Sequence, residues 1–555
     1  MRAIRLLLVL LLVLAGTAVA AGGGDAGNGA APARNLFVTH ERCLACHNGL
    51  TAPSGLDISM GNDWRSSIMA NSARDPYWQA SIRREVLDHP RAEAEIQDEC
   101  SACHMPMARY QAKVGGTMGR VFSHLAALRR MAAAGQAAPN PMTPAARLAS
   151  DGVSCSMCHQ IEAEGLGTPQ SFVAGFTVDE ASGLGADRQA FGPFEIDGGR
   201  KRVMRSSALL EPNQSKHVQD SALCGSCHTL YTHTRGPGGE VIGRLPEQMP
   251  YLEWRHSDYT EERSCQSCHM PALEEPAELT SVLGKERDGF SRHVFRGGNF
   301  LMLDILRENA GELGVVAPAA DLRVTAERTR EHLREKSARV ALERTALDGR
   351  SLAVDVRVEN LAGHKLPTAY PSRRAWLRLR VEDAGGNAVF ESGALNPDGS
   401  IQGNDNDLDP REYEPHREML TAPGQVQIYE AVMADPDGVV TTGLLRAIRY
   451  VKDNRVLPRG FAKDTAGEDI AVRGRAVDDE DFTAAGDTVR YRVETPGGGG
   501  PYTVLAELWY QPIGFRWAKN LERREAPEIA RFTGYYRGVA GNSAILLASD
   551  RKTVR

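Results

Sequence analysis

The sequence predicts an α+β multidomain protein in which a mainly α-helical half is followed by an antiparallel β-sandwich. The chain has 555 residues, which is more than one hydrophobic core normally serves, so several domains are expected. In the first half, apolar residues recur at helical spacing. After residue 338 they alternate with polar residues, which is typical of half-buried antiparallel strands. An immunoglobulin-like arrangement is one form that such a sandwich can take.

The N-terminus resembles a secretory signal. Arg2 and Arg5 are followed by the apolar run 6–14 and by small residues at 18–20 that suit cleavage. We therefore expect a signal peptide over residues 1–20, a flexible segment over 21–37 and a periplasmic or extracellular protein. A retained N-terminal anchor is the alternative, although the run is shorter than the roughly 20 residues that span a membrane. No later segment is long and apolar enough to cross one.

Local signals place the expected elements. Asp75-Pro76 begins a helix, with the acid as cap and proline in the first turn. A second helix is expected around Phe122 and Leu125, and residues 320–337 are expected to form a connecting helix. Period-two strands are expected at residues 351–360, 377–381, 489–493 and 504–510. The predicted domains are therefore 38–319 and 338–555.

Ten cysteines carry the strongest functional signal. They form five pairs with two residues between the members, and each pair is followed at once by histidine: Cys43/Cys46, Cys100/Cys103, Cys155/Cys158, Cys224/Cys227 and Cys265/Cys268. Paired cysteines in an exported protein usually indicate disulfides, but C-x-x-C-H is the attachment site for c-type haem. Zinc sites need ligands in fours, which five such motifs do not supply. The sequence therefore predicts five covalently bound c-type haems.

Each iron also needs axial ligands, and their nature decides what the haem does. The motif histidines are the expected proximal ligands: His47, His104, His159, His228 and His269. Among the ten other histidines, we expect His124, His217, His293 and His364 as distal candidates, with Met69 and His89 as weaker ones. Packing in a hydrophobic core is the alternative role for these side chains. His332 and His416 are expected to be exposed.

Two further features have ordinary interpretations. Asp405, Asp407 and Asp409 alternate in a loop, but an EF-hand requires glycine and glutamate where proline and histidine stand here, so a solvated turn is expected. The pair Arg373-Arg374 would hold a haem propionate if His364 is a ligand, and would otherwise lie at the surface.

The motifs resemble those of the multihaem cytochrome c family that includes hydroxylamine oxidoreductase and its tetrahaem cytochrome partner. The resemblance rests on the C-x-x-C-H array, on residues 64–70 (W-R-S-S-I-M-A) and on 265–271 (C-Q-S-C-H-M-P). Residues 363–374 (G-H-K-L-P-T-A-Y-P-S-R-R) are similar to a signature of multihaem proteins with a β-rich C-terminal domain. Relatives often have histidine where Met69 stands and glycine where Ala369 stands. The resemblance implies electron transfer, with haem-binding roles for His124, His217, His293 and His364.

The leading hypothesis is an electron-transfer protein whose partners are other cytochromes or quinol-linked donors. One alternative is a reductase or oxidoreductase of a small nitrogen or sulfur compound, with Arg74, Tyr77 and His89 near an open haem. Pentahaem nitrite reductases, however, usually mark that haem with C-x-x-C-K, which is absent here. Another alternative is a haem subunit of a larger extracellular redox conduit. The net charge of −6 argues against nucleic-acid binding.

Overall fold

The computed structural model describes residues 35–134, 142–185, 187–496 and 500–555. The predicted signal peptide and residues 21–34 lie outside this part of the chain. Leu36 and Phe37 are almost fully buried, and the Phe37 ring contacts Tyr110 edge-on at 5.9 Å between centroids. The end of the segment predicted to be flexible is therefore part of a hydrophobic core.

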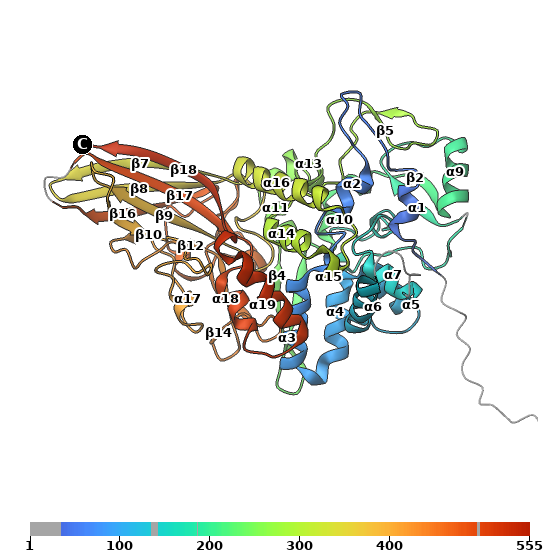
Figure 1. Ribbon diagram of the computed structural model, residues 1–555, viewed down its shortest axis with the longest axis horizontal. Helices are drawn as coiled ribbons and strands as arrows, with labels where there is room; N and C mark the ends of the chain where they lie inside the picture. The colour runs from blue at the N-terminus through green and yellow to red at the C-terminus, as the bar shows by residue number, and fades with distance from the viewer. Residues whose placement is uncertain (1–34, 135–141, 186, 497–499) are drawn as a thin grey trace, which may run out of the picture. The chain divides into compact units, whose positions relative to one another are not determined.

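Helices dominate the first 340 residues (Figure 1). Their bounds are α1 His40–Leu44, α2 Met60–Arg65, α3 Pro76–Asp88, α4 Glu93–His104, α5 Pro106–Val114, α6 Val121–Ala134, α7 Pro144–Ser150, α8 Cys155–Cys158, α9 Gly198–Ala208, α10 Ser221–Gly225, α11 Pro250–Arg255, α12 Tyr259–Glu262, α13 Cys265–His269, α14 Phe300–Glu308, α15 Ala310–Leu313 and α16 Ala319–Lys336. Among the described residues, no helix is both long and apolar enough to cross a membrane.

The helices predicted at Asp75-Pro76 and around Phe122 are both present. Asp75 caps α3 by accepting hydrogen bonds from the backbone N–H groups of Tyr77 (2.8 Å) and Trp78 (3.1 Å). Helix α6 buries Val121 and Leu125 against α3 and α4 residues in a core of their own. Three short hairpins or pairs complete this half: β1 Gln189–Gly192 with β2 Glu211–Gln214, β3 Leu230–Arg235 with β4 Val241–Gln248, and β5 Ala277–Glu278 with β6 Glu286–Arg287.

The C-terminal half contains two sheets packed face to face. One has the order β11-β16-β8-β7, and the other has β10-β9-β17-β18 with β12 paired to β9. The strands are β7 Ala338–Asp348, β8 Ser351–Asn360, β9 Arg374–Glu382, β10 Ala388–Ser392, β11 Met419–Leu420, β12 Ile428–Tyr429, β16 Gly486–Glu494, β17 Tyr502–Gln511 and β18 Ile545–Val554. The inward residues of both sheets share one core. In it, Val356 of β8 lies beside Val489 of β16 in one sheet, and Leu379 of β9 lies beside Ala506 of β17 in the other. The predicted α+β class is thus confirmed.

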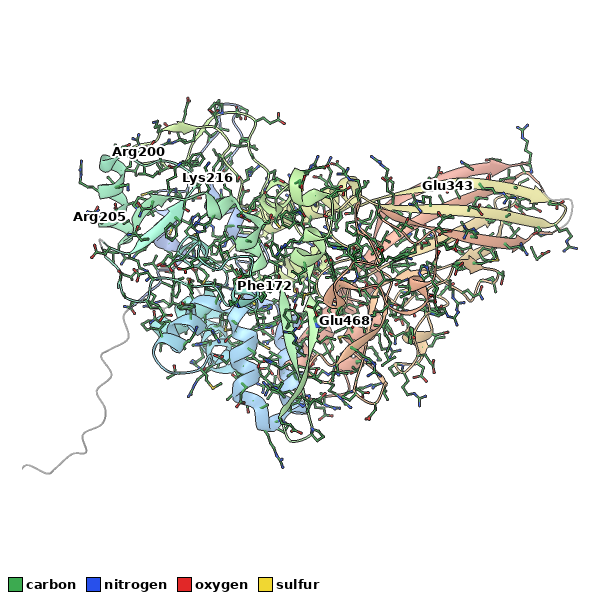
Figure 2. All side chains as sticks on the ribbon, turned by 180° about the vertical axis from the view of Figure 1, so that it is seen from behind. Phe172, Arg200, Arg205, Lys216, Glu343 and Glu468 are labelled. Atoms are coloured by element: carbon green, nitrogen blue, oxygen red, sulfur yellow. The ribbon has the colours of Figure 1, made fainter. Side chains whose placement is uncertain are left out.

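Burial alternates regularly along β8 and along most of β17. In β8, Leu352, Val354, Val356 and Val358 are buried while the residues between them are partly exposed. In β7 the register shifts between Leu342 and Arg344, and the bulged Glu343 points into solvent (Figure 2). The period of two therefore sets which side of each sheet faces the core.

Several elements of this half were not predicted. β11 pairs with β16 in parallel, and β14 Val440–Thr441, β13 Ala431–Ala434 and β15 Arg449–Asp453 form a third sheet. Helices α17 Asp405–Leu408, α18 Phe515–Leu521 and α19 Pro527–Val539 interrupt the strands. Helix α19 lies along α3 of the first half (Figure 1), where Glu528 pairs with Arg83 at 3.0 Å. Residues 338–555 are therefore not strands alone.

Candidate haem-binding cluster

Each cysteine motif begins on a turn of helix. Cys43 lies in α1, Cys100 in α4 and Cys224 in α10, while α8 and α13 begin at the first cysteines of their motifs. In the first, third and fourth motifs the histidine backbone N–H donates to the carbonyl of the first cysteine at 2.9–3.0 Å. Residues three and four positions apart share one helix face, so both thiols and the imidazole point to the same side. The C-x-x-C-H spacing thus places two thiols and one imidazole on the same side of the helix.

The five motifs come together in space. All ten cysteines are described, and none forms a disulfide. The Cys43 and Cys155 thiols lie close enough to shift each other's pKa, and the same holds for Cys103 with Cys227 and for Cys224 with Cys265. Burial, followed by the neighbouring Cys227, raises the pKa of Cys158 to about 12, which also places the third motif beside the fourth. Every motif therefore adjoins at least one other, and the fourth adjoins three.

Cys46 and Cys268 are also predicted attachment residues. Each is a half-buried free thiol, as are the other motif cysteines. The Cys46 carbonyl accepts from the backbone N–H of Ser281 at 2.8 Å, and the Ser267 hydroxyl lies 3.9 Å from the Cys268 sulfur. The role of these two cysteines in attachment stays a prediction from the C-x-x-C-H spacing.

Hydrogen bonds fix the tautomer of four motif histidines. Their Nδ1 atoms meet backbone carbonyls: His47 with Leu279 (2.7 Å), His104 with Ser72 (3.0 Å), His159 with Phe191 (2.6 Å) and His269 with Arg296. A carbonyl only accepts, so Nδ1 carries the proton and the Nε2 lone pair is left for another partner. Metal-bound histidines commonly show this arrangement.

All five motif histidines are kept neutral by burial. Burial lowers the pKa of His104 and of His228 to about 4, and it also lowers the pKa of His47, His159 and His269. Neutral imidazole is the form that binds iron. The Trp78 ring lies parallel to His104, with 4.3 Å between ring centroids, and so helps to hold that imidazole in place.

Two predicted distal histidines face motif histidines at the distance that a shared iron requires. The ring centroids of His159 and His293 are 6.3 Å apart with 28° between their planes, and those of His269 and His364 are 6.3 Å apart with 18° between planes. Two axial imidazoles on one metal have ring centres about 6.2 Å apart, because each metal–nitrogen bond is about 2 Å and the ring centre lies about 1.1 Å beyond it. His364 also donates Nδ1–H to the Lys365 carbonyl at 3.0 Å.

The other predicted candidates are placed differently. His217 has both ring nitrogens bonded, one to Ser215 Oγ (2.6 Å) and one to the Ile161 carbonyl (2.8 Å), so neither is free in this arrangement. His124 on α6 and Met69 are half-buried, and burial lowers the pKa of His124. His89 is buried with Nε2 unpartnered, and burial lowers its pKa.

The residues named for an open haem have structural partners. Arg74 is buried and donates to the carbonyls of Gly314 (2.7 Å) and Ser150 (2.6 Å). Tyr77 is buried, and its ring packs against Tyr370 and Phe532. These contacts account for both side chains without a substrate.

Two side chains around the fifth motif, those of His332 and Arg296, were not predicted from the sequence. His332, expected to be exposed, is half-buried on α16, with its ring centroid 6.2 Å from that of His269 and its Nδ1 atom unpartnered. Its neighbours at 325, 326, 329 and 333 form the buried face of α16, a periodicity that could have identified it. Arg296 and Arg373 also lie near enough to His269 to lower its pKa, after the larger effect of burial.

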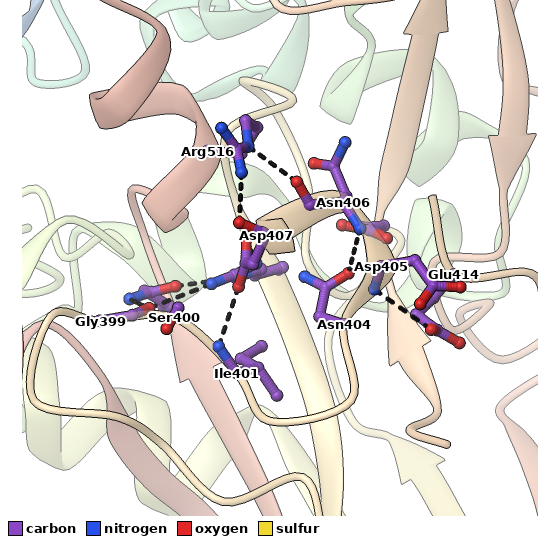
Figure 3. Close-up of polar contacts among 12 residues, drawn as sticks. Gly399, Ser400, Ile401, Asn404, Asp405, Asn406, Asp407, Glu414 and Arg516 are labelled. Carbon is purple, nitrogen blue, oxygen red and sulfur yellow. Dashed lines mark hydrogen bonds and ion pairs between the residues drawn. The ribbon is translucent and has the colours of Figure 1, made fainter. Parts of the chain in front are cut away.

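Three expectations about polar residues in the second half are wrong. Arg374 is neither exposed nor free for a propionate, since it is buried and pairs with Asp407 at 2.9 Å. Asp407 is likewise buried instead of solvated, and it also accepts from the Ile401 N–H at 2.9 Å (Figure 3). His416 is 3% exposed and donates to Asp479 at 2.9 Å, while Gln427 and Asn454 donate to its other nitrogen.

The residues present suit c-type haem. Ten thiols stand in pairs beside neutral imidazoles, most of which have Nε2 left available, and this is the donor set that covalent haem attachment uses. Buried polar atoms without partners lie nearby, among them His332 Nδ1 and Arg296 Nε. Polar atoms buried in a complete protein normally have a partner, so these orphans indicate a missing group. The guanidinium groups of Arg296 and Arg373 would suit its carboxylates.

Comparison with known proteins agrees with this organisation at the level of the fold. No family model matches the sequence, and no curated protein sequence matches it. Among solved structures, the chain is similar to the crystal structure of a penta-haem cytochrome c552 from Thermochromatium tepidum, with 17% sequence identity and a TM-score of 0.50. The alignment covers 94% of this chain and 100% of the other. The chain therefore shares a fold with that penta-haem cytochrome over nearly its whole length.

Proposed function

We propose that the protein is an exported multihaem c-type cytochrome that carries electrons through five covalently bound haems. The observation that carries the proposal is the clustering of all five C-x-x-C-H motifs, in which thiols of different motifs lie close enough to shift one another's pKa. Groups attached at neighbouring motifs would be close enough to exchange electrons. The fold shared with a penta-haem cytochrome c552 supports the same function.

The proposed attachment residues are the ten motif cysteines, Cys46 and Cys268 included, and the proposed proximal ligands are His47, His104, His159, His228 and His269. His293 would complete the third iron opposite His159, and His364 the fifth opposite His269, because of their 6.3 Å ring spacings. His124, His217, Met69 and His89 remain candidates for the other three. When bound, haem supplies a one-electron iron couple whose potential the axial ligands and burial set.

The proposal includes the organisation of the chain and its partners. Residues 1–20 would direct export to the periplasm or cell surface, residues 38–319 would hold the haems, and 320–337 would connect them to the β-rich residues 338–555. The partners would be other redox proteins, such as cytochromes or quinol-linked donors. The α16 helix and the strands that follow support this division.

The proposal is tested by spectra of the purified, oxidised holoprotein with and without cyanide or nitrite. An electron carrier with six-coordinate irons gives low-spin spectra that neither ligand changes. A high-spin fraction that binds nitrite would contradict the pure electron-carrier function and favour a reductase. A near-infrared charge-transfer band from methionine to iron would identify Met69 as a ligand.

A further inference from the structure

The loop that carries His364 is part of the C-terminal half but packs on the first half. It connects β8 to β9 and lies against α11 and α12, which directly precede the fifth cysteine motif. Tyr259 donates to the Leu361 carbonyl at 2.8 Å, and Ser257 donates to the Gly363 carbonyl at 3.2 Å. A Cβ at Gly363 would lie 3.2 Å from Tyr259, so glycine permits this close approach.

A closed network of buried charges holds the same loop. Lys365, which is fully buried, pairs through Nζ with Asp453 of β15 at 2.8 Å. Arg455 pairs with Asp453 at 2.7 Å and with Glu253 of α11 at 2.9 Å. Glu253 completes the network, because its Oε2 accepts hydrogen bonds from the Lys365 backbone N–H at 3.1 Å and from the Thr368 hydroxyl at 2.5 Å.

The network contains two cations and two anions, so its charges balance where water is excluded. Buried ion pairs are a poor source of net stability, because desolvation offsets most of the attraction. Their geometry is demanding, however, and each partner left alone is strongly penalised, so they can fix one arrangement of the chain. Here the fixed segment is the one next to His364.

We propose that Glu253, Lys365, Asp453 and Arg455 are positioning residues that hold the His364 imidazole opposite His269, so that the C-terminal half supplies and fixes a ligand of the fifth haem. This inference rests on the proposed function. His269 ends α13, which follows α11 and α12 in the chain, so the network ties the His364 loop to the segment that leads to His269 at a ring spacing of 6.3 Å.

The test compares two buried lysines in the full-length holoprotein. Lys365→Met removes the cation beside His364. Lys452→Met is the matched control, since Lys452 is equally buried and pairs with Glu430 at 3.0 Å, but does not contact the His364 loop in any described hydrogen bond or ion pair. His364→Ala provides the reference spectrum for loss of the ligand. Electron paramagnetic resonance and cyanide titration are measured for each variant, with folding followed by denaturant unfolding.

The proposal predicts that K365M gains a high-spin signal from about one haem per chain and binds cyanide there at least about tenfold more tightly than wild type, as expected when the closed state loses occupancy. K452M loses stability but keeps the wild-type spectrum. If H364A changes the spectrum and K365M does not, the positioning role is wrong while the ligand assignment stands. If H364A leaves the spectrum unchanged, the ligand assignment fails and the inference with it.

Should K365M not accumulate as holoprotein, Thr368→Val gives a milder break, since it removes only the hydroxyl that donates to Glu253. A partial high-spin fraction in T368V supports the positioning role. A T368V spectrum identical to wild type, in a protein whose H364A variant is altered, overturns it. His332→Ala tests the other histidine near His269. A high-spin change in H332A alone would assign the distal ligand of the fifth haem to His332 on α16.

Discussion

At the scale of single residues, hydrogen bonds distinguish proposed haem ligands, such as His47 with Nδ1 on a carbonyl, from structural histidines paired with carboxylates, such as His40 and His416. The proximal ligands could be proposed from the sequence because each histidine directly follows its two cysteines. His416 could not be placed from the sequence because its burial arises from residues far away in the chain, whereas the periodicity of α16 could have indicated that His332 is half-buried. His416 is held by Asp479, Gln427 and Asn454, none of which is a sequence neighbour.

His40 belongs to the structural group and gives a pH-dependent prediction. Burial alone would lower its pKa, but the hydrogen bond and charge of Asp151 outweigh burial and raise the pKa above 6.5. The folded state therefore binds the proton more tightly, and the resulting stability is fully present below about pH 6.5 and is lost as pH rises through the raised pKa.

We expect Asp151→Asn to cost about 1.5–3 kcal/mol of unfolding free energy under mildly acidic conditions, the size of a hydrogen bond to a charged group. The difference from wild type should shrink at alkaline pH. Denaturant unfolding of both proteins across the pH range measures it. A difference that grows with pH would show that the charged pair is not formed.

At the scale of elements, a helix-capping pair and period-two alternation predicted one helix start and four strands. Asp75-Pro76 begins α3, and the period of two marks β8, β9, β16 and β17. Helices α18 and α19 were not predicted, because the period-two alternation of apolar residues was taken to continue through the whole second half. Pro527 in the first turn of α19 was an available helix signal. The parallel pairing of β11 with β16 depends on tertiary contacts and leaves no local pattern.

The cap of α3 gives a prediction at this scale. Burial raises the pKa of Asp75 to about 6, although the N–H groups of Tyr77 and Trp78 oppose the shift. The charged carboxylate is therefore disfavoured in the folded state, and stability falls as pH rises from 3.8 toward 6. Asparagine caps helices as well as aspartate, so Asp75→Asn should keep α3 and abolish this fall, which amounts to about 3 kcal/mol at most at about 1.4 kcal/mol per pKa unit.

The matched control is Asp197→Asn at the cap of α9, where hydrogen bonds from the Arg200 backbone and side chain lower the pKa of Asp197 to about 2. The shift has the opposite sign there, so this variant should lose stability above the unfolded pKa of the carboxyl group. Unfolding measured between about pH 3 and pH 7 separates the two. Parallel pH profiles for wild type and D75N would contradict the burial argument.

The buried pair Arg374–Asp407 tests whether this arginine serves the fold alone. Arg374 also donates to Gln511 at 2.8 Å and to the Gly399 carbonyl at 3.1 Å, so its guanidinium is fully engaged. Arg374→Met leaves Asp407 buried without this partner and should cost about 3–5 kcal/mol of stability. The haem midpoint potentials in a spectroelectrochemical titration should not move. A shifted potential would place Arg374 near a haem after all.

At the scale of the whole molecule, the two halves are joined by the packing of α19 on α3 and by the loop that carries His364. The cysteine motifs predict five haems from local sequence alone, and this number stays a prediction. Their mutual arrangement could not be predicted, because contacts such as Cys43 with Cys155 join residues more than a hundred positions apart. The β-rich half is therefore part of the candidate site through His364.

The number of covalent haems per chain measures directly whether all five motifs carry haem. The purified protein is extracted with acidified solvent to remove any non-covalent haem, and haem per polypeptide is then measured as the alkaline pyridine haemochrome, with an intact mass as a check. We expect five haems per chain that survive extraction. Fewer than five, or haem that leaves with the solvent, would contradict it.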